Sequence, residues 1–350
     1  MYCILINRNM DLWTVFRQLN KIEGPKFFLD SSLNNPDTGR YSYIGISPNA
    51  LLRSRGEIIE YHEGGRWSSW KGDPLAALQK VLNKGKSRRL QTKIPTPFCG
   101  GLVGYMGYDM GRNLEKIPHI ATNDLMMYEQ YWGIYDCILV MDHFQRQLWI
   151  TANDLQKAKE LQQTIEASIN ACHDKEDEDT WIGELSSNFS RETYTQTVKN
   201  IKERIRQGDV YQVNLSQRFT FPLEGSSLGI YKILRRINPA PFAAVLSFDE
   251  YEILSMSPER FLRIEDRIIE TRPIKGTRPR GINKRQDRIM IEELLRSEKE
   301  RAELLMIVDL QRNDLGRLCN PGSIMVSKLF AIKKYATVIH QEANVYGILR

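Results

Sequence analysis

The sequence lacks the features that define several large classes of protein. Its 350 residues include only five cysteines, and no two of them form a Cys-x-x-Cys pair, so neither a disulfide framework nor a zinc knuckle is indicated. No apolar run approaches the ~18 residues of a membrane-spanning helix. Asn7, Arg8 and Asp11 come too early for a signal peptide. We therefore expect free thiols and a cytoplasmic protein that does not contact a membrane.

An excess of one charge is also largely absent. The chain has 49 basic and 43 acidic residues, a net charge of +6. Residues 260–288 hold ten basic and four acidic residues, so this segment alone carries +6 and the rest of the chain is close to neutral. Nucleic-acid binding requires a broad basic face with interleaved aromatic side chains, whereas a short basic stretch suits a small anionic ligand. We expect no nucleic-acid partner. The charge alone is also compatible with a solvated basic loop.

The remaining composition is that of an ordinary globular protein of about two domains, or of one large composite domain. An acidic run at 173–180 predicts an exposed connector between regions 1–172 and 181–350. Short apolar runs separated by turns mix with separate helical segments, which favours an α+β fold over regular βαβ winding. Helices are expected at 155–171, 190–207 and 285–315, and strands at 41–46, 57–61, 132–141, 147–152, 211–221, 243–248, 252–256 and 261–264.

Two segments have patterns that permit more than one interpretation. The glycines of Phe98–Gly111 do not match a phosphate-binding loop and favour close backbone packing instead. In Gly208–Phe219, polar side chains alternate with apolar ones, so a strand there could line a ligand cavity or face solvent.

The segment Ile274–Gly281 reads IKGTRPRG and could carry nucleophilic chemistry. Lys275 stands among arginines, and nearby cations favour the neutral amine that a lysine nucleophile needs. Gly276 would let a ligand approach the backbone, and Thr277 offers a hydroxyl group. An ordinary basic turn is the alternative.

A helical segment further on could hold a metal ion. Glu300 and Glu303 are three residues apart and share one helix face. Two carboxylates together with water molecules suit Mg²⁺. A charged, solvated face that includes Lys299 and Arg301 is the alternative.

Taken together, the segments resemble the chorismate-utilising enzymes, in particular the branch of aminodeoxychorismate synthase component I. The motifs occur in the same order along nearly the whole chain: FLDSS, YSYIG, GGLVGYMGYD, GDVYQVNLSQRF, NPAPFAA, SPERF, IKGTRPRG and KERAELLMIVDLQRNDLGR. The lysine of IKGT distinguishes the branches, because anthranilate synthase large subunits carry alanine there. The resemblance implies a composite α+β fold of packed antiparallel sheets flanked by helices.

The resemblance also implies a reaction. Lys275 would attack C2 of chorismate, Glu259 would protonate the departing C4 hydroxyl, and ammonia from a glutamine amidotransferase partner would give 4-amino-4-deoxychorismate, a precursor of p-aminobenzoate and folate. Substrate contacts are implied for Gly276, Thr277 and His340. Glu303 is implied as a Mg²⁺ ligand, with Glu300 beside it.

Further expectations follow from the same resemblance. A tryptophan site of the family maps onto Ser31, Tyr41, Ser42, Tyr43, Ile44, Pro241, Phe242 and Ala243. Family members continue past the position of Arg350 with a PGGSxTGAPK-type segment, so we expect the chorismate-binding region 181–350 to be incomplete at its C-terminal end. Two alternatives stay open: anthranilate synthase activity, or a catalytically incomplete fragment that binds an amidotransferase or tryptophan.

Overall fold

The computed structural model describes residues 1–6, 10–33, 35–85, 96–118, 120, 122–170 and 180–350. The chain folds into two compact units, one made of Met1–His173 and Leu234–Arg350 and the other of Asp174–Ile233. The cysteines of the described part, Cys3, Cys99, Cys137 and Cys319, are free thiols, as predicted. Within the described ranges, no helix combines the length and the apolar character needed to cross a membrane.

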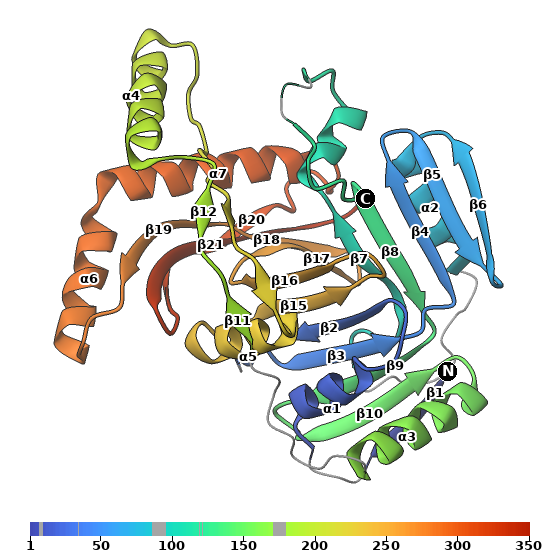
Figure 1. Ribbon diagram of the computed structural model, residues 1–350. Coiled ribbons are helices and arrows are strands. Elements are labelled where there is room, and N and C mark those ends of the chain that lie inside the picture. The colour runs from blue at the N-terminus through green and yellow to red at the C-terminus, as the bar shows by residue number, and fades with distance from the viewer. Residues whose placement is uncertain (7–9, 34, 86–95, 119, 121, 171–179) are drawn as a thin grey trace. The chain divides into compact units, whose positions relative to one another are not determined.

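The larger unit contains a seven-stranded antiparallel sheet (Figure 1). Its strands lie in the order β1 (Tyr2–Ile6), β10 (Gln147–Ala152), β9 (Cys137–Asp142), β3 (Tyr41–Ile46), β2 (Lys26–Asp30), β15 (Phe242–Ser247) and β16 (Glu252–Ser257). Strand β15 pairs with β2, and Ala243 lies opposite Asp30. Residues from both sides of the predicted connector therefore share one sheet.

Helices α1 (Leu12–Leu19) and α3 (Leu155–Asn170) contact each other and this sheet. Asp11 begins α1, because its carboxylate accepts a hydrogen bond from the backbone N–H of Thr14 at 3.1 Å. Phe16 of α1 is fully buried and stacks on Phe28 of β2 with ring centroids 5.0 Å apart. The aromatic contact anchors the helix to the strand.

A second antiparallel sheet has the order β6 (Arg66–Lys71), β5 (Ile58–Glu63), β4 (Ala50–Arg55), β8 (Gln130–Tyr135) and β7 (Gly101–Met106), with helix α2 (Pro74–Gly85) against β5. The 3₁₀ helix η1 (Tyr108–Asn113) follows β7. A Cβ atom on Gly104 would lie 1.9 Å from the carbonyl oxygen of Tyr131. This glycine thus permits close strand packing, as expected. The strand predicted at 132–141 is divided between β8 and β9, which belong to different sheets.

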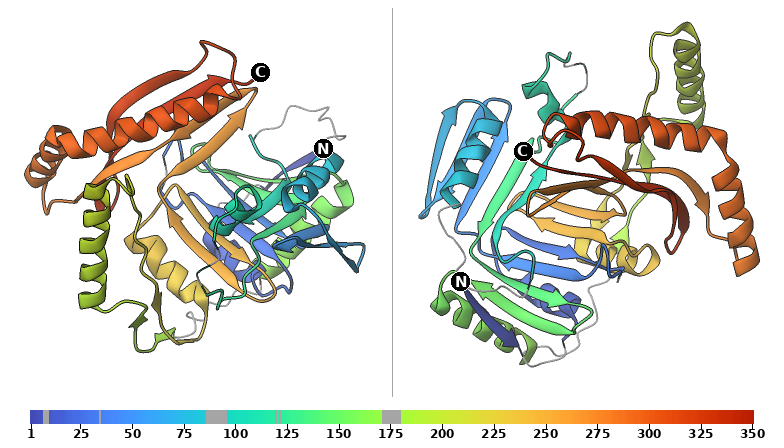
Figure 2. Two further views of the ribbon diagram at one scale, coloured as in Figure 1. Left: turned by 90° about the horizontal axis from the view of Figure 1, so that it is seen from above. Right: turned by 180° about the vertical axis from the view of Figure 1, so that it is seen from behind.

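The third sheet has the order β17 (Arg260–Glu265), β18 (Ile268–Arg272), β21 (Val338–Ile348) and β19 (Ile274–Pro279), and β20 (Met325–Lys334) also pairs with β21. Helices α6 (Lys284–Arg296) and α7 (Glu298–Gly316) pack against β19 and β21 (Figure 2). Their shared core includes Leu304, Val308 and Ala343. The single helix predicted at 285–315 is interrupted at Ser297, whose hydroxyl accepts a hydrogen bond from the N–H of Glu300 and begins α7.

The smaller unit contains helix α4 (Arg191–Gln207), which confirms the predicted helix and both of its ends. Ser190 and Thr193 form a capping box at the start, and Gly208 ends the helix with φ +81°. Short strand pairs join β11 (Trp181–Ile182) to β14 (Leu223–Glu224) and β12 (Ser186–Ser187) to β13 (Phe219–Thr220). Helix α5 (Ser227–Ile237) follows, and the boundary between the two units falls within it, after Ile233.

The strand predicted at 211–221 is wrong for most of its length. Residues 211–218 have no regular structure, and only Phe219 and Thr220 pair as a strand. Alternation of polar and apolar residues predicts two faces, but a strand also needs a neighbouring strand, and the pairing with β12 includes only Phe219 and Thr220. With its antiparallel sheets and separate helices, the chain confirms the predicted α+β fold class.

Candidate functional site

Lys275 lies on an irregular part of β19. Lys275 is opposite Gln341 and Thr277 is opposite His340 on β21, so Gly276 is an extra residue in a β-bulge. Gly276 has φ +77°, and a Cβ atom there would approach Leu294 Cδ1 to 2.7 Å and Glu300 Cβ to 3.2 Å. Both the backbone conformation and the helices packed above it therefore require glycine at this position.

The bulge places the predicted substrate residues on different faces of the sheet. Arg278 of β19 contacts Glu300 of α7 at 3.4 Å, so its side chain lies on the helix side. Lys275 is three positions away, and with one extra residue between them the two share that face. Thr277 faces the opposite way, where its Oγ1 lies 3.1 Å from Nδ1 of His340. The structure brings Thr277 and His340 together and separates them from Lys275.

Glu259 approaches β19 from the loop before β17. Its carboxylate Oε1 accepts a hydrogen bond of 3.0 Å from the backbone N–H of Ile274, the residue before Lys275. The Glu259 side chain remains exposed. The predicted acid is thus held at the start of the strand that carries the predicted nucleophile.

The arginines around Lys275 are all paired with carboxylates. Besides Arg278, Arg272 contacts Asp37 and Glu270, and Arg280 contacts Asp287 at 2.8 Å. Hydrogen bonds from Arg272 lower the pKa of Asp37 to about 2. Lys275 itself forms no ion pair or side-chain hydrogen bond with any residue that the structure describes. The positive charges of these arginines are therefore compensated by carboxylates in the folded chain.

Glu300 and Glu303 lie on one face of α7, as predicted, and both are partly buried. Glu300 is paired with Arg278, and Glu303 lies 3.7 Å from the Lys299 amine. Among the described residues, no group of three or more His, Cys, Asp or Glu side chains is arranged to hold a metal ion. Because Mg²⁺ usually keeps several waters and binds one or two protein carboxylates, the pair fits part of a magnesium site.

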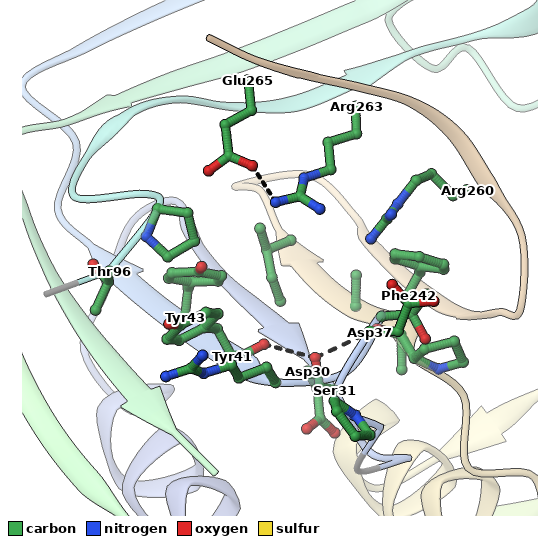
Figure 3. A pocket seen from close by; sticks show the side chains of 18 residues that line it. Asp30, Ser31, Asp37, Tyr41, Tyr43, Thr96, Phe242, Arg260, Arg263 and Glu265 are labelled. Carbon is green, nitrogen blue, oxygen red and sulfur yellow. Dashed lines mark hydrogen bonds and ion pairs between the residues drawn. The ribbon is translucent and has the colours of Figure 1, made fainter. Parts of the chain in front are cut away.

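A cavity of about 810 Å³ opens beside β2, β3, β15 and β17 in the larger unit (Figure 3). Most of the residues predicted for a tryptophan site line it: Ser31, Tyr41, Tyr43, Pro241, Phe242 and Ala243. Ser42 and Ile44 do not, because alternate side chains of β3 point to opposite sides of the sheet. The Ser42 hydroxyl instead accepts a hydrogen bond from the Ser31 N–H, and Ile44 is buried in the core.

Charged residues of this cavity were missed by the sequence reasoning. Arg40, Arg260, Arg263 and Asp37 contribute to its wall, and Arg263 forms an ion pair with Glu265 (Figure 3). Two apolar residues separate Arg260 from Arg263 in β17, so a regular strand would place the two arginines on opposite faces, but the register shift between them lets both line the cavity. The aromatic wall is held by a packing contact: the ring of Tyr43 packs edge to face against Phe98, with ring centroids 5.4 Å apart.

Comparisons with known proteins agree with these features. Residues 29–350 match the family described as chorismate binding enzyme. The chain is 36% identical over 321 residues to aminodeoxychorismate synthase component 1 of Bacillus subtilis, covering 89% of this chain and 68% of that protein. It is 37% identical to the protein of the same name from Klebsiella aerogenes, covering 87% of this chain and 66% of that protein. The chain thus spans about two thirds of the length of these relatives.

Other relatives carry a different name. Anthranilate synthase component 1 of Aquifex aeolicus is 34% identical over 355 residues, with 96% of this chain and 71% of that protein covered. The crystal structure of anthranilate synthase component I from Streptococcus pneumoniae superposes with a TM-score of 0.78 at 23% identity, covering 99% of this chain and 76% of that one. The fold is therefore that of anthranilate synthase component I, and by its family match and its sequence identity to these relatives the chain belongs to the chorismate-binding enzymes.

Proposed function

We propose that this protein contributes to the conversion of chorismate and ammonia into 4-amino-4-deoxychorismate, with Lys275 as the nucleophile. The observation that carries the proposal is the placement of Lys275, unpaired among the described residues, beside the positive-φ Gly276 in a chorismate-binding fold. The bulge that Gly276 permits sets the direction in which the Lys275 side chain leaves the strand. Relatives named aminodeoxychorismate synthase support the assignment.

The proposed reaction balances around Lys275. Its amine forms a bond to C2 of chorismate, the ring double bonds shift, and the C4–oxygen bond breaks. Glu259, held 3.0 Å from the Ile274 nitrogen, would give the leaving hydroxyl its proton. Ammonia then bonds to C4, the double bonds shift back, and the lysine amine leaves C2. The sum is chorismate plus ammonia giving aminodeoxychorismate plus water.

Three further components belong to the proposal. Glu303 and Glu300 would supply carboxylate oxygens to a Mg²⁺ ion, whose charge would balance a carboxylate of the substrate. A glutamine amidotransferase would supply the ammonia in the cytoplasm. The cavity beside β3 and β15 would hold tryptophan, since Tyr41, Tyr43 and Phe242 offer aromatic walls and Asp37 and Arg260 offer both signs of charge.

Anthranilate synthase activity is the second candidate, because relatives of similar identity carry that name. An incomplete fragment that only binds tryptophan or the amidotransferase is the third. One experiment separates them: incubation with chorismate, ammonium and Mg²⁺, followed by mass spectrometry of the product. Aminodeoxychorismate supports the proposal, anthranilate supports the second candidate, and unchanged chorismate together with heat of tryptophan binding supports the third.

A further inference from the structure

Gln341 is a buried side chain whose polar atoms are unsatisfied. It is 0% exposed, and neither its Oε1 nor its Nε2 has a hydrogen-bond partner in the described part of the chain. Most buried side-chain polar atoms have such a partner, so an isolated carboxamide requires an explanation. Gln130 shows the ordinary case: it is also 0% exposed, but it donates to the Pro74 carbonyl and accepts from Trp132 Nε1, each at 3.0 Å.

The position of Gln341 points to Lys275. The residues two positions away on β21, Ile339 and Ala343, are both fully buried, and Ala343 packs in the core beneath α7, so Gln341 faces the same helix layer. Lys275 lies directly opposite Gln341. Side chains opposite each other in antiparallel strands start about 4.5–5.5 Å apart and lie on one face.

The other polar groups around this point are already engaged. Arg278 and Glu300 pair with each other, and Glu342 pairs with Lys333 at 3.3 Å from the opposite face. Lys275, by contrast, forms no ion pair or side-chain hydrogen bond with the described residues, and its stem is only partly buried. A flexible four-carbon side chain can bring its amine back over a neighbour on the next strand. The two unengaged groups are therefore within reach of each other.

We propose that Gln341 is a positioning residue for Lys275. When the Lys275 side chain folds back over β21, the carboxamide oxygen accepts a hydrogen bond from the lysine amine and fixes the direction of the nitrogen lone pair toward the substrate carbon. A neutral amide holds the amine without placing a charge beside it. The inference rests on the proposed function, because it takes Lys275 as the nucleophile.

The test replaces Gln341 by methionine, which has similar volume and no hydrogen-bonding amide. In the full 350-residue chain, incubated with chorismate without ammonia, the rate at which the Lys275 peptide gains the mass of the adduct should fall roughly 10–100-fold, the effect of a misplaced reacting group. The concentration of chorismate giving half the maximal rate should change little. Thermal stability should stay the same or rise, because an unsatisfied polar group has been removed.

Gln130→Met is the matched control. It removes an equally buried glutamine that has both partners, so it should lower the melting temperature and leave the adduct rate per folded molecule unchanged. Gln341→Asn keeps the carboxamide on a shorter stem and should restore part of the lost rate. An adduct rate in folded Gln341→Met that equals the wild-type rate would overturn the inference, whether or not the melting temperature falls.

A separate measurement distinguishes failure of this inference from failure of the proposed function. If the wild-type chain gives no adduct with chorismate, Lys275 is not acting as the proposed nucleophile in this chain. The contact between Gln341 and Lys275 can still be measured by acetylation with acetic anhydride. Mass spectrometry of the peptides compares the rate of acetylation of Lys275 with that of the exposed Lys299. Gln341→Met should then speed acetylation of Lys275, because its amine is no longer held. An unchanged ratio shows that Gln341 does not hold the amine.

Discussion

Arg272 and Asp37 lie 235 residues apart in the sequence, yet their side chains form a pair of hydrogen bonds, one of them 2.9 Å long. Arg272 is buried and ends β18, two residues before β19 begins. Asp37 lies in the loop between β2 and β3 and contributes to the cavity wall. The contact therefore joins the cavity loop to the end of β18, which comes shortly before Lys275 in the chain.

Asp37→Asn should weaken the fold at neutral pH by about 1–3 kcal/mol, because a charge-assisted pair is lost from a largely buried arginine. The pKa of Asp37 is about 2 in the folded state and 3.8 as the ordinary value, so its contribution is present above about pH 4 and disappears as the pH falls toward 2. Urea unfolding at several pH values measures both effects.

The control for that experiment is Asp109→Asn, which removes the exposed partner of Arg112. Exposed pairs contribute about 0–1 kcal/mol, so its unfolding curve should match the wild type. If Asp37→Asn loses as much stability as the wild type between pH 4 and pH 2, the pairing of Asp37 with Arg272 does not govern acid unfolding.

Lys275→Ala should abolish the proposed covalent step without unfolding the chain, since the lysine makes no ion pair among the described residues. Formation of aminodeoxychorismate should fall by orders of magnitude, and the mass adduct on the Lys275 peptide should disappear. Some anthranilate should form by direct attack of ammonia at C2, since alanine is the residue implied for that branch. If the variant formed aminodeoxychorismate at the wild-type rate, the Lys275 amine would not be the nucleophile.

Gly276→Ala should destabilise the bulge. The φ of +77° alone costs a non-glycine residue roughly 1–2 kcal/mol, and the new methyl group would meet Leu294 at 2.7 Å. Gly322→Ala is the matched control, because Gly322 has φ +75° and nothing within 4 Å of the added atom. Chemical unfolding should show a larger loss for Gly276→Ala than for Gly322→Ala. Equal losses would mean that the helices adjust freely to the methyl group.

Tryptophan should bind the cavity, and Ala244→Leu should prevent it by filling space beside Phe242. Isothermal titration calorimetry measures the affinity, and a thermal melt of the variant checks that it folds. Heat of binding that survives in folded Ala244→Leu would place tryptophan elsewhere, and absence of heat with the wild type would remove tryptophan as the occupant.

Magnesium should bind this chain weakly, because the Glu300–Glu303 turn supplies few oxygens and each carboxylate already has a basic neighbour. Glu303→Gln should weaken the binding further. Tight, stoichiometric binding in a calorimetric titration of the wild type would contradict a site built from this turn alone.

Features that depend on near neighbours in the chain could be predicted from the sequence. Helix α4 begins at Ser190 and ends at Gly208 because capping and left-handed termination are local. The position of Lys275 before a glycine is likewise a property of the motif. The family resemblance followed from the order of such motifs, and the family match confirms it.

Contacts between distant residues depend on the folded chain and could not be predicted from the sequence. The residues at 211–218 alternate like a strand but lie outside the pairing of β12 with β13, since pairing depends on the rest of the fold. Ser42 and Tyr43 are adjacent in the sequence, yet only Tyr43 lines the cavity, because the sheet has two faces. The partners of Arg272 and the unsatisfied amide of Gln341 arise from strand register, which long-range packing fixes and local sequence does not.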